Sequence, residues 1–407
     1  MRILHVINNG STCGGAERLT ADLAERQRAD GHRVHVLAGD RPGPGDWYAD
    51  STWPVRAARG PARLRDFYYH AGAREALAGV LARFAPDVVH LHTVGLLSAG
   101  ALPLLRDVPT VMSVHGPELF LRGTVGYCLP ARYYRGGDQV RGRLGARGLA
   151  ASAWAELVTG PVTRLLLRRH VDVLTAPSPY LAHLVERSVG PARVVRNGLH
   201  GGYRAAVRPP ATRGAGLRLV TVGRLEQTKG AQVLIDALPA VLSAHPAARL
   251  TVCGTGPMRE HLPGRAADLG VGQAVTFAGW CSPAEVADTL AAAAVAVVPS
   301  IWPESFGLTA LEALATGCAV VASDGGGLPD LVRHGDTGLL VPPGDPSALA
   351  AAINRLLGDP ALRTRLAAAG SRLADRLTLD AYATRMAAVY DDVRSGRPSA
   401  TSGAGPR

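Results

Sequence analysis

The stretch LRLVTVGRLEQTKGAQVLIDALPAVLSAHPAARLTVC, residues 217–253, carries the pattern that decides the fold. It predicts a strand over Leu217–Gly223, a helix over Gly230–Ser243 and a second strand over Arg249–Cys253. Two short apolar strands separated by one longer amphipathic segment are typical of a βαβ unit in a parallel sheet.

The same alternation extends in both directions from this stretch. Toward the C-terminus, we expect elements at Met258–Leu269, Pro283–Ala293 and Leu308–Ala315 (helices) and at Val275–Ala278, Val295–Pro299 and Ala319–Ser323 (strands). Toward the N-terminus, we expect strands at Arg2–Ile7, Arg33–Ala38, Asp87–His92, Thr110–His115, Val171–Pro177 and Val194–Arg196 and helices at Ala16–Arg28, Ala73–Phe84 and Leu96–Leu105. Runs such as VVHL are apolar on both faces, as strands covered by helices on each side must be. The sequence therefore predicts a doubly wound α/β fold.

A break in this rhythm divides the chain. Residues 204–218, RAAVRPPATRGAGLR, are rich in Pro, Gly and Ala and are typical of a linker. We expect an N-terminal α/β domain over 1–205, a linker over 206–216 and a second α/β domain over 217–376. An amphipathic helix over 377–394 and a disordered tail over 395–407 follow.

Composition narrows the class of protein. The 407 residues exceed what a single core usually supports, and 47% hydrophobic side chains exclude wholesale disorder. The five cysteines are scattered without a Cys-x-x-Cys pair, so neither a disulfide framework nor a zinc site is indicated. The most apolar stretch, Leu290–Ile301, is too short to span a bilayer. We therefore expect a soluble, cytoplasmic protein.

The charge is strongly positive. A net charge of +11 and a pI near 9.9 favour anionic partners: nucleic acid, a membrane surface or phosphorylated small molecules. Six arginines, with tyrosines among them, lie in residues 122–147 against one acid, Asp138. This Arg/Tyr segment could bind an anionic acceptor, a lipid phosphate or the inner face of the membrane as a peripheral contact. The alternative is a mobile, solvated loop.

The first candidate site lies in the loop GRLEQTKG, residues 223–230, between a strand and a helix. Arg224 and Lys229 are two cations beside Gly230, which opens the helix. Backbone N–H groups and the positive helix end make such a loop suited to a phosphate. The spacing is not that of a P-loop, and the alternative is a surface loop with two ordinary cations.

The second candidate site is PESFGLTALE, residues 303–312. Glu304 follows a strand and Glu312 lies in the next helix, so both carboxylates could line a crevice at the carboxyl ends of the strands. Gly307 removes a side chain where a backbone has to approach a ligand. The alternative is a helix-capping Glu304 and an exposed Glu312.

Together, the two motifs resemble the signature of glycosyltransferase family 4, whose members are retaining enzymes of the two-domain GT-B fold. The signature here reads Gly-Arg-Leu…Lys-Gly at 223–230 and Glu-x-Phe-Gly-x4-Glu at 304–312. Further similarity lies at Gly14–Arg18, Arg196–Gly198, Leu311–Ala313, Gly317–Val321, Gly325–Gly326 and Asp336–Gly338. The resemblance covers essentially the whole chain and implies two Rossmann-like domains that face each other across a cleft holding a nucleotide-sugar. It also implies that the C-terminal helix, expected over 377–394, crosses back onto the N-terminal domain.

The resemblance implies a role for each motif residue. Arg224 and Lys229 hold the diphosphate and stabilise charge on the departing nucleoside diphosphate, as a metal ion does in other transferases. Glu304 hydrogen-bonds the donor sugar, and Glu312 binds the ribose hydroxyls. The donor-binding set also includes Gly223, Phe306, Gly307 and Leu308, the last three through backbone N–H groups.

Residues in the N-terminal half complete the implied site. His115, at the end of an expected strand, resembles the family histidine beside the reacting region of the donor sugar. Gly14 and Gly15 lie where backbone can approach the donor phosphate or the acceptor; the alternative is a tight turn. His90 and His92 could bind a metal as an HxH pair, but no third ligand is evident, so we expect His90 to pack in the core. The candidate acceptor-binding residues are Glu17, His92, Arg132 and Arg135.

The expected reaction is attack by an acceptor hydroxyl on the same face of the sugar from which the diphosphate departs. The resemblance implies no metal and no cofactor, and no Asp-x-Asp motif stands out. The donor is expected to be UDP-linked, carrying glucose or N-acetylglucosamine; the acceptor is a natural product, a polyol or a lipid-linked glycan. The alternatives are a GT-B nucleotide-sugar epimerase or hydrolase, and a non-enzymatic nucleic-acid binder. The last would need a continuous basic face with stacking aromatics, so no nucleic acid is expected.

Overall fold

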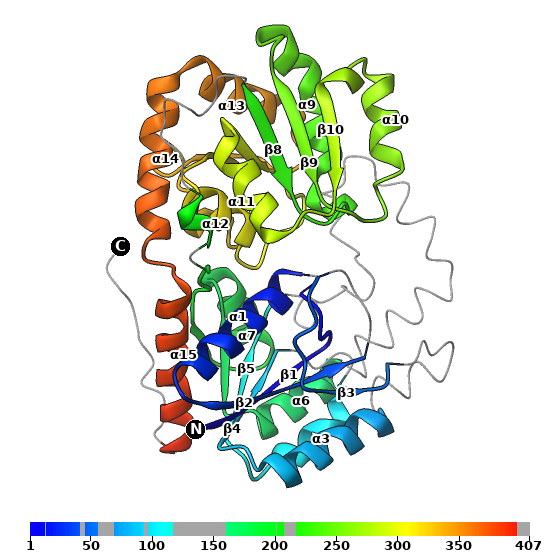
Figure 1. Cartoon of the computed structure of the whole chain (residues 1–407), viewed down its shortest axis with the longest axis vertical. Helices are drawn as coiled ribbons and strands as arrows, with labels where there is room; N and C mark the ends of the chain where they lie inside the picture. Colours follow the sequence, from blue (N-terminus) through cyan, green and yellow to red (C-terminus); the bar gives the residue numbers. More distant parts are fainter. Residues whose placement is uncertain are drawn as a thin grey trace. The chain divides into compact units, whose positions relative to one another are not determined.

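The computed structural model describes residues 1–12, 14–40, 45–55, 69–92, 97–116, 160–200, 202–206 and 217–396 (Figure 1). These residues form two compact units. The first contains the described residues up to Gly198 together with those from Leu379 onward, and the second runs from Leu199 to Thr378. This division falls before the boundary expected at residue 205. The expected linker 206–216 lies outside the described residues except for Ala206, and the expected tail except for Ser395 and Gly396.

The first unit is built on a parallel sheet of seven strands in the order β3-β2-β1-β4-β5-β6-β7. The strands are β1 (Arg2–Ile7), β2 (Arg33–Gly39), β3 (Ser51–Trp53), β4 (Val88–Leu91), β5 (Thr110–Ser113), β6 (Val173–Ala176) and β7 (Ala192–Val194). Its helices are α1 (Gly15–Ala29), α3 (Ala71–Phe84), the 3₁₀ helix η1 (Ala99–Leu105), α6 (Gly160–His170), α7 (Pro179–Ser188) and α15 (Leu379–Arg394). The chain starts in the middle of the sheet and winds outward in both directions, so β1 and β4 flank the point where the strand order reverses.

Helix α15 is the last helix of the chain and belongs to the first unit. It packs against α1 and β5, and the red and blue ribbons lie side by side in Figure 1. Its apolar side, which includes Tyr382, Met386 and Tyr390, is buried in one cluster with Ile3 and Leu23. The C-terminal helix thus completes the core on one face of the N-terminal sheet.

The second unit has a parallel sheet of six strands in the order β10-β9-β8-β11-β12-β13. The strands are β8 (Arg218–Val222), β9 (Arg249–Cys253), β10 (Val275–Gly279), β11 (Val295–Val298), β12 (Ala319–Ser323) and β13 (Leu339–Val341). The helices are α8 (Gly202–Ala205), η5 (Gln227–Lys229), α9 (Ala231–Ala244), α10 (His261–Asp268), η6 (Gly272–Ala274), α11 (Pro283–Ala292), α12 (Leu308–Ala315), η7 (Leu328–Asp330), α13 (Pro346–Gly358) and α14 (Pro360–Ala374). Here the order reverses between β8 and β11.

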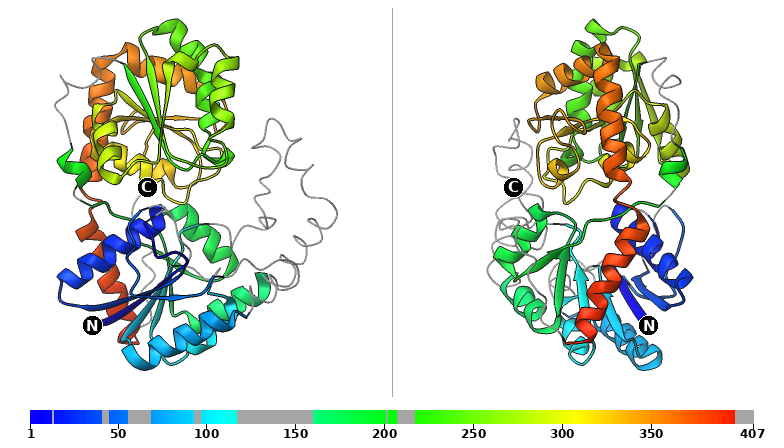
Figure 2. Two further views of the ribbon diagram at one scale, coloured as in Figure 1. Left: turned by 45° about the vertical axis from the view of Figure 1, so that its right-hand side comes forward. Right: turned by 90° about the vertical axis from the view of Figure 1, so that its left-hand side faces the viewer.

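Both faces of the second sheet are covered, as Figure 2 shows. Strand β11 illustrates why: Val295 and Val297 lie in the core that includes α9 and α13, whereas Ala296 and Val298 lie in the core that includes α11 and α12. Successive side chains of a strand point to opposite faces, so a strand buried on both sides has to be apolar throughout. The predicted doubly wound α/β architecture is confirmed.

Most expected helices and strands occur within a few residues of their predicted bounds. This is because the periodic spacing of apolar residues and the capping residues are local signals of where an element lies. Helix α11 begins with a capping box in which the Ser282 hydroxyl accepts from the Glu285 N–H and the Glu285 carboxylate accepts from the Ser282 N–H. The segment expected as a helix over Leu96–Leu105 instead forms the 3₁₀ helix η1, which has Pro103 inside it. Proline lacks the N–H that an α-helix would use at that position.

Candidate functional site

Two loops meet at the reversal point of the second sheet. Strands β8 and β11 pair in parallel, so the loop after β8 (residues 223–230) and the loop after β11 (residues 299–307) leave the same edge. The backbone N–H groups of Ile301 and Trp302 donate to the Thr228 carbonyl oxygen at 2.9 and 3.1 Å. Open α/β sheets bind ligands outside the carboxyl ends of the strands at such a point. The two sequence motifs are therefore brought together where a ligand site is expected.

Gly230 permits this close approach of the loops. Its φ of +74° lies in the left-handed region, and a Cβ atom at this position would lie 1.9 Å from the carbonyl oxygen of Pro299. Any other residue would force the loop after β8 away from the loop after β11. The glycine of the Lys-Gly pair is thus required by packing between backbones as well as by the start of α9.

Lys229 and Glu304 form the centre of the site. The Lys229 Nζ donates to both carboxylate oxygens of Glu304, at 2.7 and 3.0 Å, and the Ser300 hydroxyl donates to Oε1 at 2.6 Å. Burial by itself raises the pKa of the Glu304 carboxyl. The Lys229 ammonium, the Ser300 hydroxyl and the positive charge of Arg224 outweigh that effect and hold the pKa below its ordinary value. Glu304 is therefore a carboxylate at neutral pH, held beside a cation.

Lys229 is also unusual in the sequence. It is the only lysine among the 44 Lys and Arg residues of the chain. Arginine's planar guanidinium and lysine's compact ammonium are not interchangeable at a phosphate or carboxylate. The presence of the chain's one lysine at this position therefore indicates a functional role for it. The spacing of the motif residues does not contain this signal.

Arg224 lies at the exposed side of the same loop. Its guanidinium pairs with Glu226 at 2.9 Å, and its side chain is 62% exposed. Gly223, just before it, has a φ of +150°, and its N–H donates to the Cys253 carbonyl oxygen at 3.0 Å. The contact with Glu226 is a surface pair, which contributes little to stability, so the guanidinium can turn to an anionic ligand at small cost.

The remaining donor-site candidates lie on the loop before α12 and on α12 itself. Phe306 is buried in the core beside Ala310 and Leu311, so its side chain packs and only its backbone is available to a ligand. Gly307 caps α12 with a φ of +93°, where a Cβ atom would lie 2.5 Å from Leu328. Leu308 is the first residue of the helix.

Glu312 lies within α12, the helix that Leu308 begins. Its carboxylate accepts a hydrogen bond from the Tyr203 hydroxyl at 3.0 Å. Tyr203 comes from the short helix α8, and no pattern in the sequence pairs it with Glu312. Tyr203 is therefore an additional residue at the candidate ribose-binding position.

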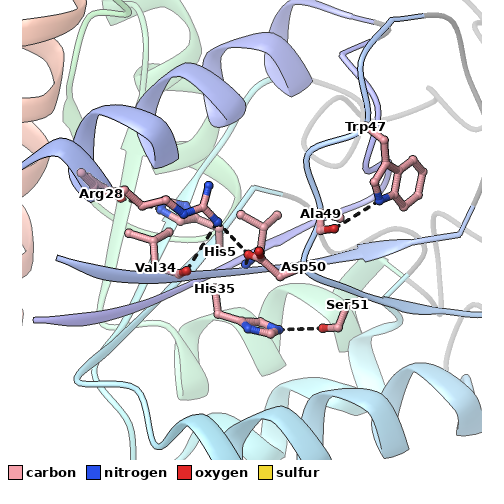
Figure 3. Close-up of polar contacts among 10 residues, drawn as sticks. His5, Arg28, Val34, His35, Trp47, Ala49, Asp50 and Ser51 are labelled. Carbon is pink, nitrogen blue, oxygen red and sulfur yellow. Dashed lines mark hydrogen bonds and ion pairs between the residues drawn. The ribbon is translucent and has the colours of Figure 1, made fainter. Parts of the chain in front are cut away.

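In the first unit, the loop after β1 carries the glycine motif. Gly14 caps α1 in an extended conformation, Gly15 begins the helix, and Glu17 is the acid of its first turn. The segment after residue 44 runs along this loop: Thr12 N donates to Asp46 O at 3.0 Å and Tyr48 N donates to Gly10 O at 2.8 Å. Figure 3 shows the neighbouring contacts, including that of Trp47 with Ala49. These contacts fix the start of the loop that leads into α1.

His115 is the partly exposed end of a chain of hydrogen-bonded side chains. Its Nε2 lies 3.0 Å from Nδ1 of His92; Nε2 of His92 lies 2.9 Å from Nδ1 of His5; and Nε2 of His5 lies 2.7 Å from Oε1 of Gln27. His5 lies on β1 and Gln27 on α1; His92 is the residue after β4, and His115 is the second residue after β5. The structure brings His92 and His115, which the sequence named separately, into contact, and His5 and Gln27 are additions that the sequence did not suggest.

A second arm starts from the same glutamine. Nε2 of Gln27 donates to the Tyr390 hydroxyl at 3.2 Å, and that hydroxyl lies 2.7 Å from Nδ1 of His90. Nε2 of His90 lies 2.7 Å from the Ser113 hydroxyl, which in turn lies 2.8 Å from that of Thr175. His90 is thus buried, as expected, but within a polar network and not among apolar side chains.

The three buried histidines could in principle hold a metal ion. One ring nitrogen from each of His5, His90 and His92 lies within 4.8 Å of the other two, so His5 is the third ligand that the sequence did not reveal. A metal ion bound here would replace the hydrogen bond between His5 and His92. It would also replace one of the two hydrogen bonds of His90, which go to the hydroxyls of Tyr390 and Ser113. The described side chains satisfy both nitrogens of each ring without a metal, which fits a hydrogen-bonded network.

All four histidines are held neutral by burial. Burial lowers the pKa of His5 and of His115 to about 4, and the pKa values of His90 and His92 lie well below the ordinary range. Loss of solvent disfavours the charged imidazolium, and the neighbouring rings add to the effect. Each ring at neutral pH therefore carries one N–H and one lone pair.

Acid is expected to destabilise the first unit. The folded pKa of His5, about 4, lies below its ordinary 6.5, so the unfolded chain binds the proton between those pH values and stability falls as the pH drops through this window. For His5 alone, the free energy of unfolding is expected to fall by about 2 kcal/mol between pH 7 and pH 5. Urea unfolding at pH 7 and at pH 5 measures the free energy of unfolding at each pH. The His5→Asn variant should show a smaller difference between the two values. Equal stability at pH 7 and pH 5 would contradict it.

Some predicted features lie outside the described residues. These are Arg132, Arg135 and the whole Arg/Tyr segment 122–147. Among the helices in the described ranges, none combines the length and the apolar character that crossing a bilayer requires.

Comparison with protein families gives matches over both halves of the chain. Residues 13–200 match the family described as Glycosyltransferase Family 4, and residues 208–372 match Glycosyl transferases group 1. A glycogen synthase from Mycobacterium tuberculosis is 34% identical over 347 residues, which cover 83% of this chain and 75% of the relative. A D-inositol 3-phosphate glycosyltransferase from Acidothermus cellulolyticus is 41% identical over 196 residues, 46% of this chain and 43% of that protein.

Solved structures share the fold over nearly the full length. Sucrose-phosphate synthase from Thermosynechococcus elongatus superposes with a TM-score of 0.75 at 25% identity, covering 97% of this chain and 100% of that one. The Anabaena protein HepE, in complex with UDP-glucose, superposes with a TM-score of 0.71 at 20% identity, covering 96% and 100%. The two parallel sheets are those of the GT-B fold, as the sequence predicted.

Proposed function

The chain belongs to glycosyltransferase family 4, and from this premise we propose that it moves a sugar from a nucleoside diphosphate-sugar to an acceptor hydroxyl with retention of anomeric configuration. The observation that carries the proposal is the pair Lys229–Glu304 at the reversal point of the second sheet, with Arg224 near enough to lower the pKa of Glu304. A carboxylate and two cations at the carboxyl edge suit a sugar attached to a diphosphate.

The proposed chemistry uses the two cations in place of a metal ion. As the bond between sugar and phosphate breaks, negative charge grows on the departing diphosphate, and Arg224 and Lys229 stabilise it. Glu304, which Lys229 and Ser300 keep ionised, accepts hydrogen bonds from hydroxyls of the donor sugar. The acceptor hydroxyl attacks on the face from which the diphosphate leaves, and the diphosphate takes its proton.

For the donor, we propose a UDP-sugar of the glucose or N-acetylglucosamine type. The relatives include a glycogen synthase and a sucrose-phosphate synthase, and the Anabaena neighbour binds UDP-glucose. The Glu312–Tyr203 pair is the proposed ribose site, since a carboxylate accepts both vicinal hydroxyls. For the acceptor, we propose a natural product, a polyol or a lipid-linked glycan, bound by the first unit.

A thermal-shift panel tests donor binding. UDP-, GDP-, ADP- and dTDP-glucose are each added to the wild type, and one nucleotide is expected to raise Tm, because ligand at a hundred times Kd stabilises the folded chain by about 2.7 kcal/mol. Arg224→Ala/Lys229→Ala should abolish the shift. Arg333→Ala is the control, since Arg333 is an exposed arginine of the same unit that precedes β13, an edge strand separated from β11 by β12.

Product analysis then separates the transferase from its alternatives. NMR of the product should show the donor's anomeric configuration in a new glycoside that forms only when acceptor is present. Free sugar or an epimerised nucleotide-sugar formed without acceptor would favour a hydrolase or an epimerase. Failure of every nucleotide-sugar to shift Tm at millimolar concentration would overturn the proposed donor site.

A further inference from the structure

The buried network in the first unit determines the proton positions of its own histidines. Gln27, His5, His90 and His92 are all at most 5% exposed, so water does not compete for their hydrogen bonds. The imidazole rings of these three histidines and of His115 are neutral, and each neutral ring has one N–H donor and one lone-pair acceptor. In an unbranched row of such rings, the direction of the first hydrogen bond therefore dictates the direction of all the others.

The row begins at the Gln27 amide. Its oxygen faces Nε2 of His5, so this nitrogen must carry the proton and donate it to Gln27, which leaves Nδ1 of His5 as an acceptor. Nε2 of His92 then donates to His5, and Nδ1 of His92 accepts. Nε2 of His115 donates to that nitrogen. Nδ1 of His115 is left with a lone pair, and among the described residues it has no hydrogen-bond partner.

The same amide also begins the second arm. The Gln27 amide N–H donates to the Tyr390 hydroxyl, so that hydroxyl donates to Nδ1 of His90, and Nε2 of His90 donates to Ser113. Turning the amide over would reverse every bond in both arms and would move the proton of His115 to Nδ1. Arg28 follows Gln27 in the last turn of α1. It donates to Asp50 at 2.7 Å and to the Val34 carbonyl oxygen at 3.4 Å, and these contacts hold the C-terminal end of α1 against β2 (Figure 3).

We propose that Gln27 is a positioning residue which, through His5 and His92, fixes His115 in the tautomer with the proton on Nε2. Nδ1 of His115 is then a hydrogen-bond acceptor for a substrate hydroxyl at the carboxyl ends of the strands of the first sheet. The opposite tautomer would present an N–H at this position, and the hydroxyl could then only accept a hydrogen bond from the ring and not donate one to it. This use of the tautomer rests on the proposed transferase function, whereas the tautomer itself rests on the burial of the rings and on the hydrogen-bond geometry.

The test reads the tautomer directly. Long-range ¹H–¹⁵N spectra of protein labelled in histidine distinguish a protonated Nε2 from a protonated Nδ1, and His115→Asn assigns the signal. The wild type is expected to show the Nε2–H form of His115. Gln27→Met, which keeps the length of the side chain but has no amide, should give a mixture of both forms. It should also lower kcat by about tenfold or more while the KM for the donor stays within about twofold.

Tyr390→Phe is the matched control, because it removes the second arm and leaves the Gln27–His5 hydrogen bond in place. It should change the signals of His90 and keep the Nε2–H form of His115. An unchanged His115 tautomer in Gln27→Met, with a folded protein by urea unfolding, would overturn the proposal. A changed tautomer in a protein that transfers no sugar in any variant would overturn the proposed function and leave the network assignment standing.

Discussion

Replacing Lys229 with methionine is expected to lower kcat/KM for sugar transfer by about a thousandfold. The substitution removes the ammonium that lies 2.7 Å from Glu304, while the unbranched stem keeps its packing. The departing diphosphate then loses one of its two proposed counter-charges. Steady-state kinetics with the nucleotide-sugar found in the thermal-shift panel measures the effect, and the donor's KM should rise together with the fall in kcat.

A second variant decides what Lys229 does. If the lysine served only to neutralise Glu304, the double variant Lys229→Met/Glu304→Gln would regain activity, because no unpaired carboxylate would remain. We expect no such recovery, since a neutral amide in place of the carboxylate does not supply the missing positive charge beside the diphosphate. Recovery to within about tenfold of the wild type would contradict the proposed role of Lys229 and leave Arg224 as the phosphate ligand.

Gly230→Ala is expected to destabilise the second unit by about 4 kcal/mol. The left-handed backbone costs about 1–2 kcal/mol for an alanine, and the Cβ atom, 1.9 Å from the Pro299 carbonyl oxygen, forces apart the two loops of the site. Tm should fall by about 10 °C. Donor binding should also weaken, because Lys229 and Glu304 lie on the two separated loops. Differential scanning fluorimetry with and without donor measures both effects.

Gly344→Ala is the matched control for this substitution. Gly344 has the same φ, +74°, but a Cβ atom there has no heavy atom within 4 Å. Its cost should be confined to the backbone conformation, about 1–2 kcal/mol, with donor binding unchanged. Equal losses of stability in the two variants would mean that the contact with Pro299 is relieved by a small shift of the loop.

The local pattern of the chain was sufficient for the fold class and for placing the two motifs in loops that follow strands. The spacing of apolar residues, the Pro/Gly-rich break and the motifs at 223–230 and 304–312 are each readable within one short stretch of sequence. Lys-Gly indicates the start of a helix because glycine can adopt the left-handed conformation that Gly230 has. Leu96–Leu105 was wrong as an α-helix because Pro103 lies inside it, a local signal that the apolar pattern outweighed.

The pairings within each unit were decided only by the tertiary structure. Lys229 and Glu304 are 75 residues apart, and Gln27 and Tyr390 are 363 apart. Each pair meets because strand order brings its loops or helices to one place, and strand order depends on packing over a whole sheet, which no local pattern encodes. His115 was a candidate from the sequence alone, but the tautomer of its ring depends on side chains from β1, α1 and β4 that only the folded sheet assembles.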